Sequence, residues 1–192
     1  MVSPDEILSF WLDEIGPKGW YNPTDELDDT IRDRFGAAHD AAMEGTYGLW
    51  LTYPSGTLAY LILTDQFPRN MYRGQGKAFA SDHAARAAAK LAIEKGWDLK
   101  IDEPARQFFY LPLMHSENLA DQERCVRLMK ERMPQAGEEN LLHAQAHRQV
   151  IRLFGRFPYR NEALSRAGTK GEAEYLDQGG YGHTVRELQA AQ

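Results

Sequence analysis

The stretch SDHAARAAAKLAIEKG, Ser81 to Gly96, carries the signals of a helix from start to finish. Ser81 or Asp82 can cap the first turn, because a short polar side chain accepts hydrogen bonds from backbone N–H groups that have no partner inside the helix. Alanine, a strong helix former, fills the middle. Gly96 then ends the helix, since glycine adopts the left-handed backbone conformation of a helix end at little cost.

Similar signals recur on both sides of this stretch. Ser3-Pro4-Asp5-Glu6 forms a capping box with proline at the first helical position, and Gly16-Pro17 is expected to stop that helix. Thr169 to Glu172 repeats the capping box near the other end of the chain. Further helices are predicted from Asn22-Pro23 to Gly45, from about Pro54 to Gln66, from Asp102 to Leu111 with a break at Pro112, from about Asn118 to Met133, and in a segment that ends at Phe154.

Strand signals are weak throughout the chain. The β-leaning run Leu49 to Tyr53 does not alternate over enough residues to compete with the helical period. Short connections between the predicted helices favour antiparallel pairs. We therefore predict an all-α domain of about seven to nine antiparallel helices over residues 1–178. The glycine-rich and then polar residues 179–192 are expected to form a flexible tail.

Composition narrows the classes of function. The chain has 192 residues, which suits one domain, and a net charge of −6, which disfavours binding to nucleic acids or anionic membranes. Cys125 is the only cysteine, so an internal disulfide is excluded and a reducing compartment fits. The start of the chain does not resemble a signal peptide, and no apolar stretch approaches the ~20 residues that span a bilayer. A cytoplasmic protein is expected.

Three polar stretches interrupt the apolar helical pattern. DQFPRN at Asp65 to Asn70 and GRFPYRN at Gly155 to Asn161 are near-duplicates, and YLPLMHSENLADQE lies between them at Tyr110 to Glu123. Their flanks are plain apolar helix, whereas these stretches carry many different polar groups. We predict that the three stretches together build one site.

Helical periodicity places several of these polar groups where apolar ones are expected. Asp65 follows the face of Leu58 and Leu61, His147 precedes Val150 on its face, and Gln122 lies within a similar apolar stripe. Burying such groups without partners costs roughly 2–7 kcal/mol each. They must therefore pair with one another, with water or with a ligand.

The residue types suggest roles within such a site. Histidine and carboxylate side chains suit proton transfer, and arginine matches carboxylate or phosphate groups. Candidate acid–base residues are His115, Glu117, His147 and Asp65, and candidate ligand-binding residues are Arg69, Asn70, Gln122, Arg156, Arg160 and Asn161. No cofactor and no metal site is predicted. His143 and His147 lie four residues apart, but two histidines at this spacing are common in helices without metal.

The motifs resemble the bacterial family known as domain of unknown function 924. The resemblance is carried by Phe10-Trp11, by DQFPRN, by AFASD at Ala78 to Asp82, by YLPLMHSE at Tyr110 to Glu117, and by FGRFPYRN at Phe154 to Asn161. It implies a helical fold similar to tetratricopeptide-type helix arrays. It implies no particular activity, so the motif residues stay candidates.

Three functional interpretations remain open at this point. The first is a polar pocket between helices that binds a small anionic ligand, with hydrolysis or group transfer by histidine and glutamate if the protein is an enzyme. The second is a helical scaffold that binds a peptide or protein. Exposure of Trp20, Trp50 or Trp97 would support this interpretation. The third is that the polar residues only tie helices together.

Overall fold

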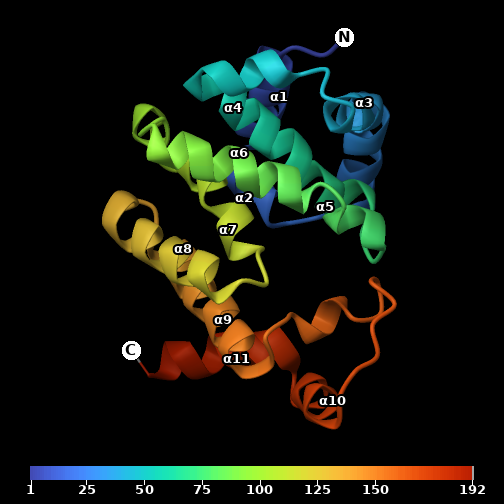
Figure 1. Cartoon of the computed structure of the whole chain (residues 1–192), viewed down its shortest axis with the longest axis vertical. Coiled ribbons are helices and arrows are strands. Elements are labelled where there is room, and N and C mark those ends of the chain that lie inside the picture. The colour runs from blue at the N-terminus through green and yellow to red at the C-terminus, as the bar shows by residue number, and fades with distance from the viewer. Residues whose placement is uncertain (192) are drawn as a thin grey trace. The chain divides into compact units, whose positions relative to one another are not determined.

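The computed structural model describes residues 1–191, and every regular element among them is helical (Figure 1). The all-α class predicted from the sequence is confirmed. The chain divides into two compact units, Met1–Pro112 and Leu113–Gln192, which are described one at a time below. That residues 1–178 act as one domain, and that the helices pair as in tetratricopeptide arrays, stay predictions. No helix of the described residues is long and apolar enough to cross a membrane.

The first unit contains helices that begin close to the positions predicted. Ser3 caps the first helix through the expected capping box with Glu6, and Thr24 caps the third. The α-helices of this unit are α1 (Pro4–Leu8), α2 (Gly16–Trp20), α3 (Asp25–Met43), α4 (Pro54–Leu61), α5 (Phe67–Met71) and α6 (Asp82–Glu94). The β-leaning run noted in the sequence forms a 3₁₀-helix, Gly48–Thr52.

Two π-helical segments form the last turns of two predicted helices. Ser9–Ile15 connects α1 to α2, and Ile62–Gln66 connects α4 to α5. The predicted end of this helix at Gln66 was therefore wrong, because α5 continues the helical path. The wide π turn places Pro68 in the first turn of α5, where its missing N–H group costs little. Pro17 occupies the same position in α2. Gly16, with a φ of 66°, ends the segment Ser9–Ile15 as predicted, and the short helix α2 begins there.

The predicted helix from Asp102 to Leu111 also differs in detail. Residues Ala105–Phe109 form a 3₁₀-helix. The next helix, α7 (Leu111–Met114), contains the last two residues of the first unit and the first two of the second. Pro112 is the second residue of α7, so it opens a helix where a break was expected. The proline ring fixes the backbone φ angle at a value that suits the first turn of a helix.

Aromatic rings fill the core of the first unit. Phe10, Phe35 and Phe67 lie with their ring centroids 4.9–6.0 Å apart. Trp11 packs edge-on against Phe67, and its backbone carbonyl accepts a hydrogen bond of 2.7 Å from Trp20 Nε1. These contacts join helices distant in sequence, so Phe10 and Trp11 of the π-helical segment Ser9–Ile15 anchor the core of this unit.

The second unit is built on a pair of long helices. They are α8 (Leu119–Arg132) and α9 (Glu138–Phe154), which pack against each other, followed by α10 (Lys170–Asp177) and α11 (Gly180–Ala190), the latter packed on α9 (Figure 1). Thr169 caps α10 as predicted, and Asn118, the predicted start of its helix, caps α8. Residues 180–190, expected to belong to a tail, form α11. The core of the unit gathers Val150, Ile151, Phe157 and Tyr175.

Candidate functional site

The first polar stretch lies in the first unit and is occupied by internal pairs. Asp65 is buried, and its carboxylate accepts a hydrogen bond from the amide of Gln66. Arg69 donates to the backbone carbonyl of Asp65 at 2.5 Å and to Asp82 at 3.1 Å. These contacts tie α5 to the first turn of α6, so Asp65 and Arg69 hold this unit together.

Asn70 is engaged in the same manner. Its side-chain amide donates to Asp28 of α3 at 2.8 Å, and Arg73 grips both carboxylate oxygens of Asp28 at 2.9 and 3.0 Å. A buried carboxylate requires such partners, because an uncompensated charge in the interior is costly. Asp65, Arg69 and Asn70 therefore have a clear structural role. That they share a site with the other two stretches stays a prediction.

The second and third stretches come together within the second unit. Glu117 accepts two hydrogen bonds from Arg166, at 2.8 and 3.0 Å, and one of 2.8 Å from the backbone N–H group of Phe157. Burial disfavours the charged carboxylate, but the hydrogen bonds from Arg166 and Phe157 and the positive charges of Arg166 and Arg160 outweigh it and lower the pKa of Glu117. Glu117 is thus an ionised anchor, which suits positioning better than proton transfer.

Arg156 is also committed to the fold. Its guanidinium donates to both carboxylate oxygens of Glu172, at 2.6 and 2.7 Å, and to the carbonyl of Ala167 at 2.8 Å. The hydrogen bonds from Arg156 and from the backbone of Thr169 lower the pKa of Glu172 to about 2. Glu172 also completes the capping box of α10. Arg156 therefore fastens the third stretch to α10.

Gln122 positions the segment that carries His115. Its side chain is fully buried, and its Nε2 group donates to the backbone carbonyls of Met114 at 2.6 Å and Ser116 at 2.7 Å. These carbonyls lie at the last residue of α7 and just beyond it, where the helix offers no further backbone donors. Gln122 thus holds both residues beside His115 from the neighbouring helix α8.

Around His115 lies a cluster of rings and one guanidinium group, which we call the histidine cluster: His115, His143, His147, Phe157, Arg160 and Tyr181. The ring centroids of His115 and His147 are 6.4 Å apart, and that of Phe157 is 5.4 Å from His147. Arg160 is buried, lies over the Phe157 ring at 4.4 Å, and donates to the backbone carbonyl of His115 at 3.1 Å. Four separate chain segments meet here.

His147 is held in one protonation state. The pKa of His147 is lowered to about 3, mainly by burial. A hydrogen bond to the His143 carbonyl favours the charged form and opposes this shift, whereas the charges of His115, Arg160 and His143 add to it. Its Nδ1 lies 2.8 Å from that carbonyl oxygen, which can only accept a hydrogen bond. The proton of the neutral ring is therefore on Nδ1, and Nε2 carries a lone pair.

Asn161 adds a buried amide near the end of the third stretch. Its backbone carbonyl accepts a hydrogen bond of 2.8 Å from the N–H group of Arg166. Its side-chain oxygen is buried and finds no hydrogen-bond partner among the described residues. Asn161 therefore helps to close the loop that carries Arg166, and its side chain retains capacity to bind.

Three members of the histidine cluster, His143, Phe157 and Tyr181, were not among the predicted site residues. Tyr181 lies in α11, within residues that were expected to form a tail. Arg166, which pairs with Glu117 outside the cluster, lies beyond the motif. His143 was weighed only as a metal ligand. Among residues 1–191, no group of three or more His, Cys, Asp or Glu side chains is arranged to hold a metal ion. Helical spacing in residues 180–190 could have indicated α11, but not that Tyr181 contacts α9.

Comparisons with known proteins agree with this helical architecture. A solved structure of ATU0120, a protein of unknown function from Agrobacterium tumefaciens, is similar to this chain with a TM-score of 0.85 and 39% sequence identity, over 91% of this chain and 97% of that one. No curated protein matches the chain significantly. Residues 7–180 match the model of a family described as bacterial protein of unknown function. The chain therefore belongs to the bacterial DUF924 family.

Proposed function

We propose that the histidine cluster binds a small anionic ligand. The observation that carries this proposal is the convergence of His115, His147 and Arg160 from three segments of the second unit. Burial is the main cause of the low pKa of His147, and the positive charges of His115 and Arg160 lower it further. Positive charges of this kind attract an anion. Arg160 supplies a planar guanidinium group, whose geometry suits carboxylate or phosphate oxygens.

The protonation states favour binding over acid–base chemistry. With a pKa of about 3, His147 is neutral near pH 7, so its Nε2 can accept a hydrogen bond but is a weak base. Glu117 is ionised and bonded to Arg166 and Phe157. A suitable ligand has a negative oxygen, which the Arg160 guanidinium can bind, and an acidic O–H group, which can donate to Nε2 of His147. Hydrolysis or group transfer stays a prediction, as does a cytoplasmic location, with which the single buried cysteine is compatible.

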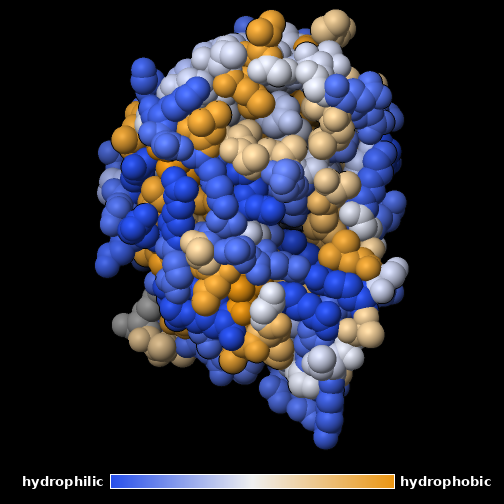
Figure 2. Space-filling model, viewed as in Figure 1, coloured by the Kyte–Doolittle hydropathy of each residue, from blue (hydrophilic) through white to orange (hydrophobic). Residues whose placement is uncertain are grey.

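The scaffold interpretation has less support. Trp20 and Trp50, whose exposure would have favoured it, are buried, and Trp97 is half-buried beneath Lys95. On the face drawn in Figure 2, hydrophobic residues occur as small patches among hydrophilic ones. Scattered patches of this kind are ordinary on protein surfaces. A peptide or protein partner therefore remains the second interpretation.

Thermal unfolding in the presence of inorganic phosphate tests the proposal. A ligand that binds the folded state raises its stability by RT ln(1 + [L]/Kd), which is about 1.4 kcal/mol at ten times Kd. We expect phosphate to raise the melting temperature above that in chloride of equal ionic strength, with succinate as a second anion. Arg160→Gln should abolish the shift.

The matched control is Arg152→Gln. Arg152 lies on the exposed side of α9 and pairs with Glu123, so its removal takes away the same charge without touching the cluster. The phosphate shift should persist in this variant. A shift of equal size in Arg160→Gln and the wild type, or no shift with either anion, would count against the proposed site.

A further inference from the structure

Tyr181 lies between two histidines of α9. Its hydroxyl oxygen is 2.5 Å from Nδ1 of His143 and 3.2 Å from Nδ1 of His147. The centroid of the Tyr181 ring lies 5.9 Å from that of His143 and 4.7 Å from that of His147. One hydroxyl of α11 thus links side chains one helical turn apart on α9.

The directions of these hydrogen bonds follow from one fixed proton. His147 carries its proton on Nδ1, because that atom bonds the carbonyl of His143. The Tyr181 oxygen can therefore only accept from His147, and its own proton is directed to His143 Nδ1. His143 must then carry its ring proton on Nε2. The three groups form a chain in which every donor points the same way.

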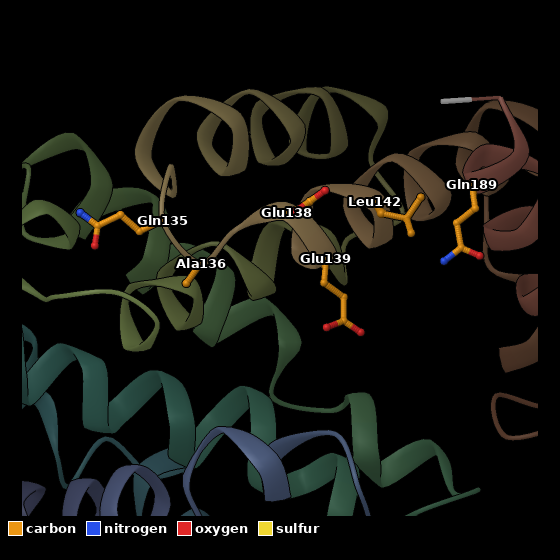
Figure 3. Close-up of a pocket in the computed structure, with 6 residues that line it drawn as sticks. All are labelled: Gln135, Ala136, Glu138, Glu139, Leu142 and Gln189. Carbon is orange, nitrogen blue, oxygen red and sulfur yellow. The ribbon is translucent and has the colours of Figure 1, made fainter.

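The far end of this chain reaches the surface. Nε2 of His143 lies 4.0 Å from a carboxylate oxygen of Glu139, and the side chains are 37% and 87% exposed. Glu139 lines an open hollow of about 480 Å³ at the start of α9, and its carboxylate extends away from the helix (Figure 3). The partly exposed ring of His143 can exchange protons with solvent water.

We propose that Tyr181 and His143 relay protons between His147 and solvent. When Nε2 of His147 gains a proton, its Nδ1–H bond breaks and that proton passes to the Tyr181 oxygen. The Tyr181 hydroxyl proton passes to His143 Nδ1, and the Nε2 proton of His143 leaves to water. One proton moves in total, and no electron is transferred. The use of this relay by a ligand rests on the proposed function, but the relay itself does not.

The surroundings favour a concerted transfer. Burial and the charges of His115 and Arg160 oppose a protonated His147. Burial, followed by the charges of Tyr159 and Tyr175, raises the pKa of Tyr181 and so opposes its ionised form. Separate charged intermediates are therefore disfavoured at both positions, whereas the chain passes a proton without leaving a charge on Tyr181.

Proton exchange in the ligand-free protein tests the relay. Nuclear magnetic resonance gives the tautomers of His143 and His147 from nitrogen shifts and the exchange rate of the His147 Nδ1 proton with water. We expect Tyr181→Phe to slow this exchange by more than about tenfold, equivalent to about 1.4 kcal/mol in the barrier. A merely structural role predicts the opposite sign, because a loosened site exchanges faster.

His143→Gln is the second variant, since the half-exposed His143 side chain can be replaced without emptying the core, and its backbone carbonyl stays in place. It should slow the exchange to a similar extent. Tyr175→Phe is the control, because it removes a neighbouring hydroxyl that bonds Thr184 and lies outside the chain. Unchanged or faster exchange in both variants, or a resting His147 ring that carries its proton on Nε2, overturns the relay. Neither result bears on phosphate binding, which is measured separately.

Discussion

Individual polar residues of the motifs divide into anchors and cluster members. Arg69, Arg156 and Glu117 each have charged partners that fasten one segment to another. His115, His147 and Arg160 instead gather around aromatic rings. Both kinds of residue look alike in a sequence, because a polar group on an apolar stripe needs a partner of some sort but does not say which.

Glu117 gives the sharpest prediction at this scale. Glu117→Gln is expected to lower the free energy of unfolding by about 1–3 kcal/mol at pH 7, because Arg166 loses a charged hydrogen-bond partner. Folding lowers the pKa of Glu117 below its unfolded value near 4.3. The ionised carboxylate therefore stabilises the fold above that pH, and this contribution is lost as pH falls through the folded pKa. Urea unfolding at pH 7 and about pH 3 should show the difference closing.

Glu123→Gln serves as the control for this measurement. Glu123 also pairs with two arginines, Arg148 and Arg152, but its side chain is 43% exposed. Solvent screens such pairs, so the expected loss is about 1 kcal/mol or less. A loss for Glu117→Gln that does not exceed this value, or that persists in acid, would show that Glu117 is not the anchor described.

Among the helices, proline positions show what the sequence could and could not predict. Capping residues such as Ser3 and Thr169 act within a few residues of chain, so the helix starts were predictable. The π segments were not, because one extra residue in a turn leaves the apolar period almost unchanged over a short stretch. Pro68 and Pro112 were consequently interpreted as stops, although each opens a helical turn.

The junction at Pro68 leads to a prediction. Proline has no N–H group for the carbonyl four residues earlier, Thr64, and the hydroxyl of the buried Ser81 donates to that oxygen at 2.6 Å. Ser81→Ala should therefore lower the free energy of unfolding by about 1–3 kcal/mol. In a Pro68→Ala background the loss should shrink, because alanine restores a backbone donor.

Urea unfolding of the single and double variants measures this coupling. The exposed Ser55, in the first turn of α4, gives the matched control Ser55→Ala, for which surface substitution predicts a change within about 0.5 kcal/mol. If Ser81→Ala lowers the free energy of unfolding equally in both backgrounds, the Ser81 hydroxyl does not replace a backbone donor of residue 68 at the Thr64 carbonyl.

For the molecule as a whole, the sequence predicted the class of fold. The second and third polar stretches contact each other through Glu117 with Phe157 and through Arg160 with His115, whereas one site built by all three stretches stays a prediction. Tyr181 could not be placed, because its contacts depend on how α11 returns to α9, which no local pattern encodes. The packing of one helix against another that is distant in sequence depends on tertiary contacts throughout the unit.

Each unit has its own buried core, which leads to a prediction about cooperativity. Val150 is fully buried in the second unit, and Val150→Ala should cost about 1–3 kcal/mol through lost packing. Hydrogen exchange of the full chain should then show weaker protection of amides in α9, with α4 unchanged, because local stability follows the core to which an element belongs. Ile31→Val, in the buried face of α3, should have the reverse pattern. An equal loss of protection in α4 and α9 from either substitution would instead support the prediction that residues 1–178 form one domain.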